Sequence, residues 1–272
     1  MGILKRRTPW EQEFREVWKR EQKFLRQYET KRENPVEAAV AGIAPEKLVR
    51  TLHGAFEKAF ALMFERGSGF IKRMGRQQER RRERQVREYA LNLREDRKNL
   101  RAFSKAADKA GRGNVLLSGA AGVGMGFFGV AIPDVPLFTA MLLKSVYETA
   151  EAFGFPCESE TERLYVLRVI EAALSEGEEL RRRGQELDAF AQTGLWSRPG
   201  DVTAQTKATA HKLSEAVLYG KALQGIPVVG AVGGAGDAVC LGRVQRYAAI
   251  KYRKRFLISR RAEQALAVVE QN

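Results

Sequence analysis

The sequence has little of the chemistry on which most enzymes and metal sites depend. It contains only two cysteines, Cys157 and Cys240, and two histidines, His53 and His211. The cysteines match no metal-ligand or redox spacing, so a reduced cytosolic compartment is expected. GxSxG, HExxH and Walker-lysine motifs are absent, and the histidines are far apart in the sequence. We therefore expect no enzymatic activity, no catalytic residue, no metal and no cofactor.

The sequence also lacks the period-two alternation of apolar and β-branched residues that marks a half-buried strand. Helical spacing recurs instead, with apolar stripes predicted over 8–31, 45–66, 161–174 and 202–219. In the first of these the predicted buried stripe comprises Trp10, Phe14, Trp18, Leu25 and Tyr28. We expect an all-α fold: a single helical domain over 1–272, with amphipathic helices around a central Gly-rich apolar helical hairpin.

Glycine is abundant in two segments, a predicted hairpin at 113–155 and a second helical segment at 220–256. The first contains GxGxxG at 124–129, but a helical pattern precedes it where a dinucleotide fold needs a strand. We interpret the glycines as a helix-packing seam. The seam residues are Gly119, Gly122, Gly126, Gly129, Gly230 and Gly234. Length permits 115–132 to cross a bilayer, so burial in the protein and insertion in lipid both stay open.

A proline-rich break follows the first glycine run. Asp134 is expected to cap the next helix, with Pro133 before it and Pro136 in the first helical turn. A role for Asp134 in ion or ligand contact is the alternative. Asp237 stands similarly at the start of a helical pattern in the second glycine segment, and we group it with these elbow residues.

Charge is strongly unbalanced: 47 Lys and Arg against 33 Asp and Glu give a net charge of +14. Basic residues concentrate at 72–101 and 243–261, which suggests contact with an anionic surface. The candidate contacts are Arg76, Arg80, Arg81, Arg84, Arg243, Arg246 and Arg253. The alternative for 72–101 is a solvated helix held by pairs such as Glu83 with Arg87. In the second segment an apolar stripe is predicted, comprising Leu241, Val244, Ala248, Tyr252 and Phe256.

Several stretches resemble the EcsC protein family. They read GAAGVGMGFFGVAIPDVPLFTAMLLKSVYETAEAFGF, then IPVVGAVGGAGDAVCLGRVQRYAAIKYRKRF, with WEQEFREVW and APEKLVRTLHGAFEKAF nearer the N-terminus. The resemblance covers nearly the whole chain. It implies a bacterial, mostly helical protein on the cytosolic side, linked with membrane processes because the family's namesake is encoded beside an ABC transporter. It carries over no catalytic residue.

Together these patterns predict a non-enzymatic, membrane-proximal protein. Its basic surfaces would dock on anionic lipid or on a membrane protein such as a transporter. The alternative is a soluble binding protein that encloses a hydrophobic ligand in the apolar hairpin. The basic segments have few aromatic residues for base stacking, so no nucleic-acid partner is expected. The expected location is the cytoplasm, at the inner face of the cytoplasmic membrane, and the oligomeric state is left open.

Overall fold

The computed structural model describes residues 7–29, 46–65, 77–110, 135–198, 200–223 and 235–270. Every regular element in these residues is a helix, and no strand occurs among them. The predicted all-α fold class is confirmed. The helices are α1 (Pro9–Gln27), α3 (Glu46–Glu65), α5 (Gln77–Leu93), an unlabelled helix over 97–110, α7 (Val135–Ala152), α8 (Glu160–Leu174), α9 (Gly177–Thr193), α10 (Val202–Leu223) and α11 (Ala235–Glu270).

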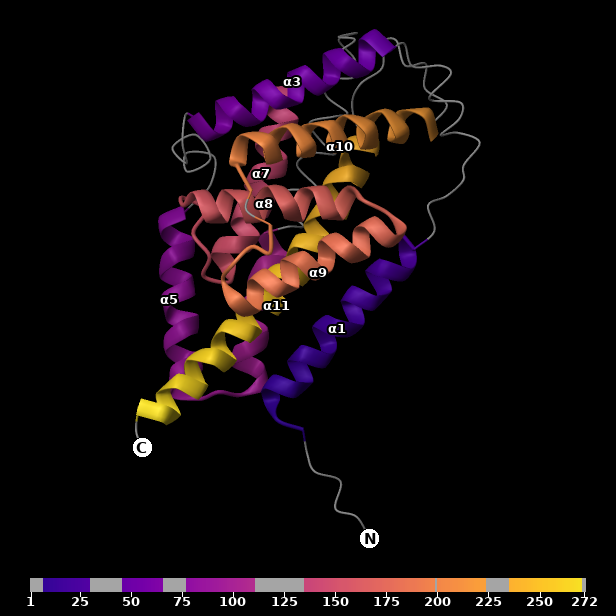
Figure 1. Cartoon of the computed structure of the whole chain (residues 1–272). Coiled ribbons are helices and arrows are strands. Elements are labelled where there is room, and N and C mark those ends of the chain that lie inside the picture. The colour runs from indigo at the N-terminus through magenta and orange to yellow at the C-terminus, as the bar shows by residue number, and fades with distance from the viewer. Residues whose placement is uncertain are drawn as a thin grey trace.

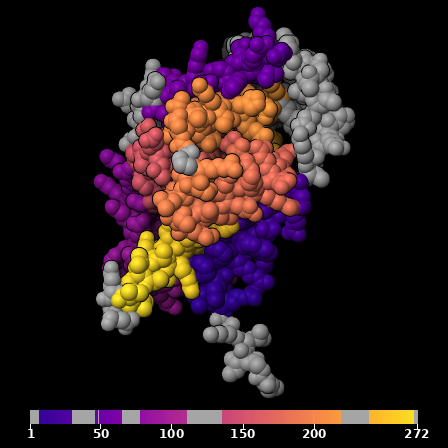
Figure 2. Space-filling model, viewed as in Figure 1, coloured from indigo at the N-terminus to yellow at the C-terminus, as the bar shows by residue number. Residues whose placement is uncertain are grey.

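The long C-terminal helix α11 lies at the centre of the arrangement (Figure 1). It contacts α1, α7, α8, α9 and α10, while α3 packs on α10 and α7, and α5 packs on α7. In Figure 2 the C-terminal turns of α11 reach the surface beside α1. A single helix therefore joins segments from both ends and the middle of the chain.

Local sequence signals explain where several helices begin and end. Thr8 caps α1 in a reciprocal capping box with Glu11, and proline occupies the first helical position. Ser159 caps α8 by accepting a hydrogen bond from the backbone of Glu162. Gly194 ends α9 at φ 70°, in the left-handed region that glycine adopts without steric cost. These caps fix the elements independently of their packing.

The core is built from the apolar stripes of the helices, much as their spacing predicts. The prediction is confirmed for α3, α10 and α11, whose predicted inward residues are buried wherever the structure describes their side chains. These residues are Leu52, Phe56, Phe60 and Met63 in α3, Ala210, Leu213, Val217 and Leu218 in α10, and Leu241, Val244, Ala248, Tyr252 and Phe256 in α11.

The buried face of α1 differs from the predicted stripe. Trp18 is 50% exposed, whereas Val17 and Phe24 are buried together with the carboxylates Glu13 and Glu21. The prediction that Trp18 is buried is wrong. The buried face turned out to include two acidic side chains because α11 supplies basic partners for them.

Those partners form two buried ionic contacts between α1 and α11. Arg253 pairs with Glu13, and Lys251 pairs with Glu21. Lys251 also donates to Asp188 of α9 at 2.8 Å. Charges buried in this way need such partners, because each one loses its hydration on folding. The contacts therefore fix the position of α1 along α11.

Close approach of α9 to α11 requires a glycine. A Cβ atom at Gly184 would lie 2.9 Å from the Tyr247 hydroxyl oxygen, which is closer than such atoms approach in proteins. The Gly184 carbonyl also accepts a hydrogen bond from Lys251 at 2.9 Å. A side chain at this position would require the buried Tyr247 side chain, and with it that of Lys251, to shift.

Candidate docking surface and adjoining pocket

The arginine-rich helix α5 packs against the protein through three partly buried arginines and the buried Leu91 on one face. Arg80 forms an ion pair with Glu148 of α7, and Arg87 lies over the ring of Phe103 with 5.7 Å from guanidinium carbon to ring centroid. Arg84 lies between them on the same face, because these positions are four and three residues apart. The cationic stripe of α5 therefore faces the neighbouring helices while remaining partly exposed.

One buried and one exposed carboxylate pair with this inward arginine stripe. Glu148 has a 5% exposed side chain and also pairs with Lys144 at 3.2 Å. Arg87 pairs with Glu83 at 3.7 Å, as predicted from their four-residue spacing. Burial lowers the pKa of Arg87, and the neighbouring Glu83 opposes that effect. Arg87 keeps its charge, because the ordinary pKa of arginine is far above neutrality.

The opposite face of α5 carries apolar side chains that point into solvent. Val86, Tyr89 and Leu93 are 68%, 66% and 70% exposed. Their spacing of three and four residues places them on one stripe, and Arg82 lies one turn before Val86 on that stripe. Arg94, directly after Leu93, has an 82% exposed side chain. We call Arg82, Val86, Tyr89, Leu93 and Arg94 the outer face of α5.

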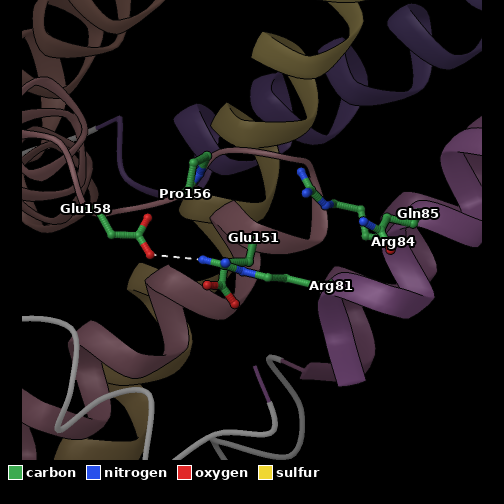
Figure 3. A pocket seen from close by; sticks show the side chains of 6 residues that line it. All are labelled: Arg81, Arg84, Gln85, Glu151, Pro156 and Glu158. Carbon is green, nitrogen blue, oxygen red and sulfur yellow. Dashed lines mark hydrogen bonds and ion pairs between the residues drawn. The ribbon is translucent and has the colours of Figure 1, made fainter. Parts of the chain in front are cut away.

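A pocket of about 490 Å³ lies between α5 and the connection from α7 to α8 (Figure 3). Its lining residues are Arg81, Arg84, Gln85, Glu151, Pro156 and Glu158. Arg81 reaches from α5 towards Glu158 and forms an ion pair with it at 3.0 Å. The pocket thus has arginines on the α5 wall and carboxylates on the facing wall.

The turn that closes this pocket depends on Gly154. Its φ of 94° lies in the left-handed region, where a side chain would be strained. A Cβ atom there would also lie 3.2 Å from a terminal nitrogen of Arg84. Glycine therefore allows both the turn after α7 and the approach of the Arg84 guanidinium to it.

A family model describes most of the chain that builds this surface. The model of the EcsC protein family matches residues 11–257. The chain belongs to the EcsC protein family. No curated protein and no solved structure matches it. The matched range of this EcsC protein includes α5, the pocket and most of α11.

The second basic segment of the EcsC protein directs two of its candidate arginines inward. Arg253 is 3% exposed and pairs with Glu13. Arg243 lies 3.7 Å from the ring centroid of Tyr28 and donates to the Ser175 carbonyl at 2.8 Å. Burial lowers the pKa of both arginines, and their carboxylate neighbours oppose it. These two guanidinium groups hold α11 to its neighbours inside the protein.

Arg246 differs from these two arginines because its side chain is exposed. It donates to the Tyr28 hydroxyl at 3.1 Å. Of the predicted candidates, the structure brings together Arg80, Arg81 and Arg84 on α5. It places Arg246 on a different helix.

The remaining predicted residues divide into two groups. Pro136 lies in the first turn of α7, and Asp237 lies in the first turn of α11. The other predicted hairpin, seam and elbow residues, and Arg76, lie outside the described residues. These are Gly119, Gly122, Gly126, Gly129, Gly230, Gly234, Pro133 and Asp134. The two alternatives for the predicted hairpin, burial in the protein and insertion in lipid, therefore both stay predictions.

The described residues contain neither a membrane-spanning helix nor a candidate metal site. None of the described helices combines the length and apolar character needed to span a bilayer. In the same residues no group of His, Cys, Asp and Glu side chains is arranged to hold a metal ion.

The outer face of α5 and the carboxylate wall of the pocket in this EcsC protein were not predicted from the sequence. A helical projection of 77–93 separates the stripe of Arg80, Arg84 and Arg87 from that of Val86, Tyr89 and Leu93. That signal was present in the sequence. Glu151 and Glu158 had no comparable signal, because their place depends on the turn after α7.

Proposed function

We propose that this EcsC protein is a non-enzymatic peripheral protein that docks on anionic lipid at the cytoplasmic face of a membrane through the outer face of α5. The observation that supports this proposal is the exposed apolar stripe of α5. Its arginine stripe faces the protein, whereas Val86, Tyr89 and Leu93 face solvent. A helix with exposed apolar residues and arginines beside them is suited to the headgroup boundary of a bilayer.

The basic residues near the outer face of α5 favour anionic lipid as the partner. Arg82 and Arg94 are exposed at the two ends of the apolar stripe, and the whole chain carries a net charge of +14. Each basic residue near an anionic membrane contributes about 1 kcal/mol. Full burial of an apolar side chain of this size contributes about 1.5–3 kcal/mol. The two contributions together predict reversible binding that needs both the apolar side chains and the anionic lipid.

Co-sedimentation with vesicles tests the proposal. The chain should bind vesicles that contain phosphatidylglycerol, should bind phosphatidylcholine vesicles weakly, and should dissociate as salt is raised. Equal binding to both vesicle types would contradict electrostatic docking. Binding that resists salt and carbonate extraction would show insertion, and absence of binding to either vesicle would overturn the proposal.

A matched pair of leucines locates the binding surface. Leu93 on α5 and Leu195 after α9 are 70% and 74% exposed. Leu93→Asn should weaken vesicle binding roughly fivefold to tenfold, because it removes about 1 to 1.4 kcal/mol of apolar burial. Leu195→Asn should bind as the wild type does. An equal effect of the two variants would show that the outer face of α5 is not the contact.

A further inference from the structure

The pocket beside α5 presents opposite charges on its two walls. Arg81 and Arg84 extend from α5, while Glu151 comes from the end of α7 and Glu158 from the turn before α8 (Figure 3). Pro156 contributes apolar surface between the walls. A simple anion in this space would meet two carboxylates, and a simple cation would meet two arginines. The lining is therefore complementary to a ligand that carries both charges.

The pocket has room for such a ligand. Its volume of about 490 Å³ is within the range of small-molecule sites. The ion pair across it, Arg81 with Glu158, has side chains 47% and 39% exposed. Exposed pairs of this kind contribute little to stability, so ligand charges can replace their mutual contact at low cost. Arg84 pairs with Glu88 at 3.6 Å, which is longer than a hydrogen bond.

The chemistry of the two walls indicates which charged groups fit. Arginine presents a planar set of N–H donors that matches the oxygens of a phosphate group. Carboxylates accept hydrogen bonds from a primary ammonium group. Gln85 also lines the pocket and lies one helical turn before Tyr89 of the outer face. The pocket therefore borders the surface that we propose to meet lipid headgroups.

We propose that this pocket binds a phosphoethanolamine group, with Arg81 and Arg84 on the phosphate and Glu151 and Glu158 on the ammonium. The group can come from a free phosphoethanolamine compound or from the headgroup of phosphatidylethanolamine. Only the lipid source rests on the proposed docking function. The charge pattern of the pocket is independent of it.

Calorimetric titration without vesicles tests the pocket alone. Phosphoethanolamine should bind at least tenfold more tightly than inorganic phosphate or ethanolamine, because only the complete group contacts both walls. Phosphocholine should bind more weakly, since its quaternary ammonium has no N–H to donate. No binding of phosphoethanolamine, or binding no tighter than that of phosphate, would overturn the proposal.

Variants test which wall of the pocket contacts the phosphate and which contacts the ammonium group. Arg81→Gln and Glu151→Gln should each weaken phosphoethanolamine binding roughly tenfold, as expected for loss of a charge-assisted hydrogen bond. Glu151→Gln should not weaken the binding of phosphate alone. Arg50→Gln is the matched control, because the Arg50 side chain is 73% exposed on α3. An equal loss in the control, or no loss in either pocket variant, would contradict the assignment.

Vesicle binding distinguishes the free compound from the lipid headgroup as the source of the ligand. It also distinguishes the pocket proposal from the docking proposal. If the ligand is the lipid headgroup, phosphatidylethanolamine added to anionic vesicles should increase binding of the wild type but not of Glu151→Gln. If only the soluble compound binds, that increase will be absent while the calorimetric binding persists. Vesicle docking that depends on Leu93 without phosphoethanolamine binding would overturn the pocket and leave the docking function. Phosphoethanolamine binding without vesicle docking would overturn the docking function and leave the pocket.

Discussion

Lys251 shows how a fully buried charge is maintained in this protein. Its side chain is 1% exposed and contacts carboxylates of α1 and α9, Glu21 and Asp188. Lys254 joins the same two carboxylates at 2.7 Å each. Burial by itself would lower the pKa of Lys251, but Tyr247, Glu21 and Asp188 together raise it above the ordinary value of 10.5. The lysine stays protonated because its neighbours compensate for the lost hydration.

Removing one carboxylate from this cluster should destabilise the fold strongly. Glu21→Gln leaves the two buried ammonium groups with Asp188 as their shared carboxylate, and we expect a loss of about 3 kcal/mol in the free energy of unfolding. Urea denaturation measures the loss. Glu16→Gln is the control on the same helix, since the Glu16 side chain is 36% exposed. Equal losses in the two variants would show that the buried cluster contributes no more than a surface pair.

The lowered pKa of Glu21 predicts how the stability of the fold depends on pH. Burial acts to raise the pKa of Glu21, but the coulombic effects of Lys251 and Lys254 outweigh it and lower that pKa below the ordinary value of 4.5. A carboxylate with a depressed folded-state pKa stabilises the fold above its unfolded pKa. This contribution is lost as pH falls below 4.5.

Thermal denaturation at a series of pH values checks this dependence. The melting temperature of the wild type should fall more steeply below pH 4.5 than that of Glu21→Gln, which has no proton to gain at this position. Parallel acid profiles for the two proteins would show that Glu21 does not contribute to acid unfolding.

Helix α5 departs from the usual amphipathic arrangement, although Leu91 on its inner face is buried. A surface helix normally turns its apolar stripe to the core and its charges to water. In α5 the inward stripe includes Arg80, Arg84 and Arg87, and the outward stripe includes Val86 and Leu93. The inward arginines are tolerated because α7 and the helix over 97–110 provide a carboxylate and an aromatic ring.

This orientation predicts unequal effects of Arg80 and Arg82 on stability. Arg80→Ala should cost about 1–2 kcal/mol, because Glu148 loses one of its charged partners. Arg82→Ala should change the free energy of unfolding by less than about 0.5 kcal/mol, as surface substitutions usually do. Chemical denaturation of both variants measures the difference. A larger cost for Arg82→Ala would contradict the orientation of the helix.

The sequence was sufficient to predict the helices whose buried faces are apolar. The four-residue steps of Phe56 and Phe60 in α3, and the stripe through Tyr252 in α11, predicted buried positions that the structure confirms. The same reasoning failed on α1, where Trp18 is half exposed and Glu13 is buried. Its partner Arg253 lies 240 positions away, and local periodicity contains no information about a contact at that separation.

The candidate pocket was harder to predict from the sequence than the helices were. The arginines of 72–84 were recognised as a distinctive charge cluster, but their direction depends on which carboxylates α7 and its following turn bring near them. Glu158 pairs with Arg81 across 77 positions. Only the packing of α5 on α7 establishes that pair, so the pocket could not be predicted from the spacing of charges.

At the scale of the whole molecule, basic charge is divided between interior pairs and the surface. Arg253 and Lys251 are enclosed with carboxylates, whereas Arg82 and Arg94 of the outer face are exposed to solvent. Salt screens exposed charges over distances of roughly 8–10 Å at moderate ionic strength and affects buried pairs much less. The two groups should therefore respond differently to salt.

Raising salt should weaken docking before it weakens the fold. We expect vesicle binding to fall at least tenfold between about 0.05 and 0.5 M salt, while the melting temperature without vesicles changes little. Co-sedimentation and thermal denaturation in the same buffers provide the comparison. A parallel decline of the two would show that salt acts on folding, and that loss of binding does not report surface electrostatics.

The central position of α11 also affects how the protein is made. Trp10 of α1 donates to the carbonyl of Leu257 at 2.8 Å, so the contact joins residues 247 positions apart. A ribosome synthesises α1 long before it synthesises this part of α11, and until then Glu13 and Glu21 have no basic partner from that helix. The docking of α1 must therefore follow translation of α11. A chain that stalls before Lys251 would lack the contacts of α1 with this part of α11, which would leave the buried face of α1 more open to chaperones and proteases.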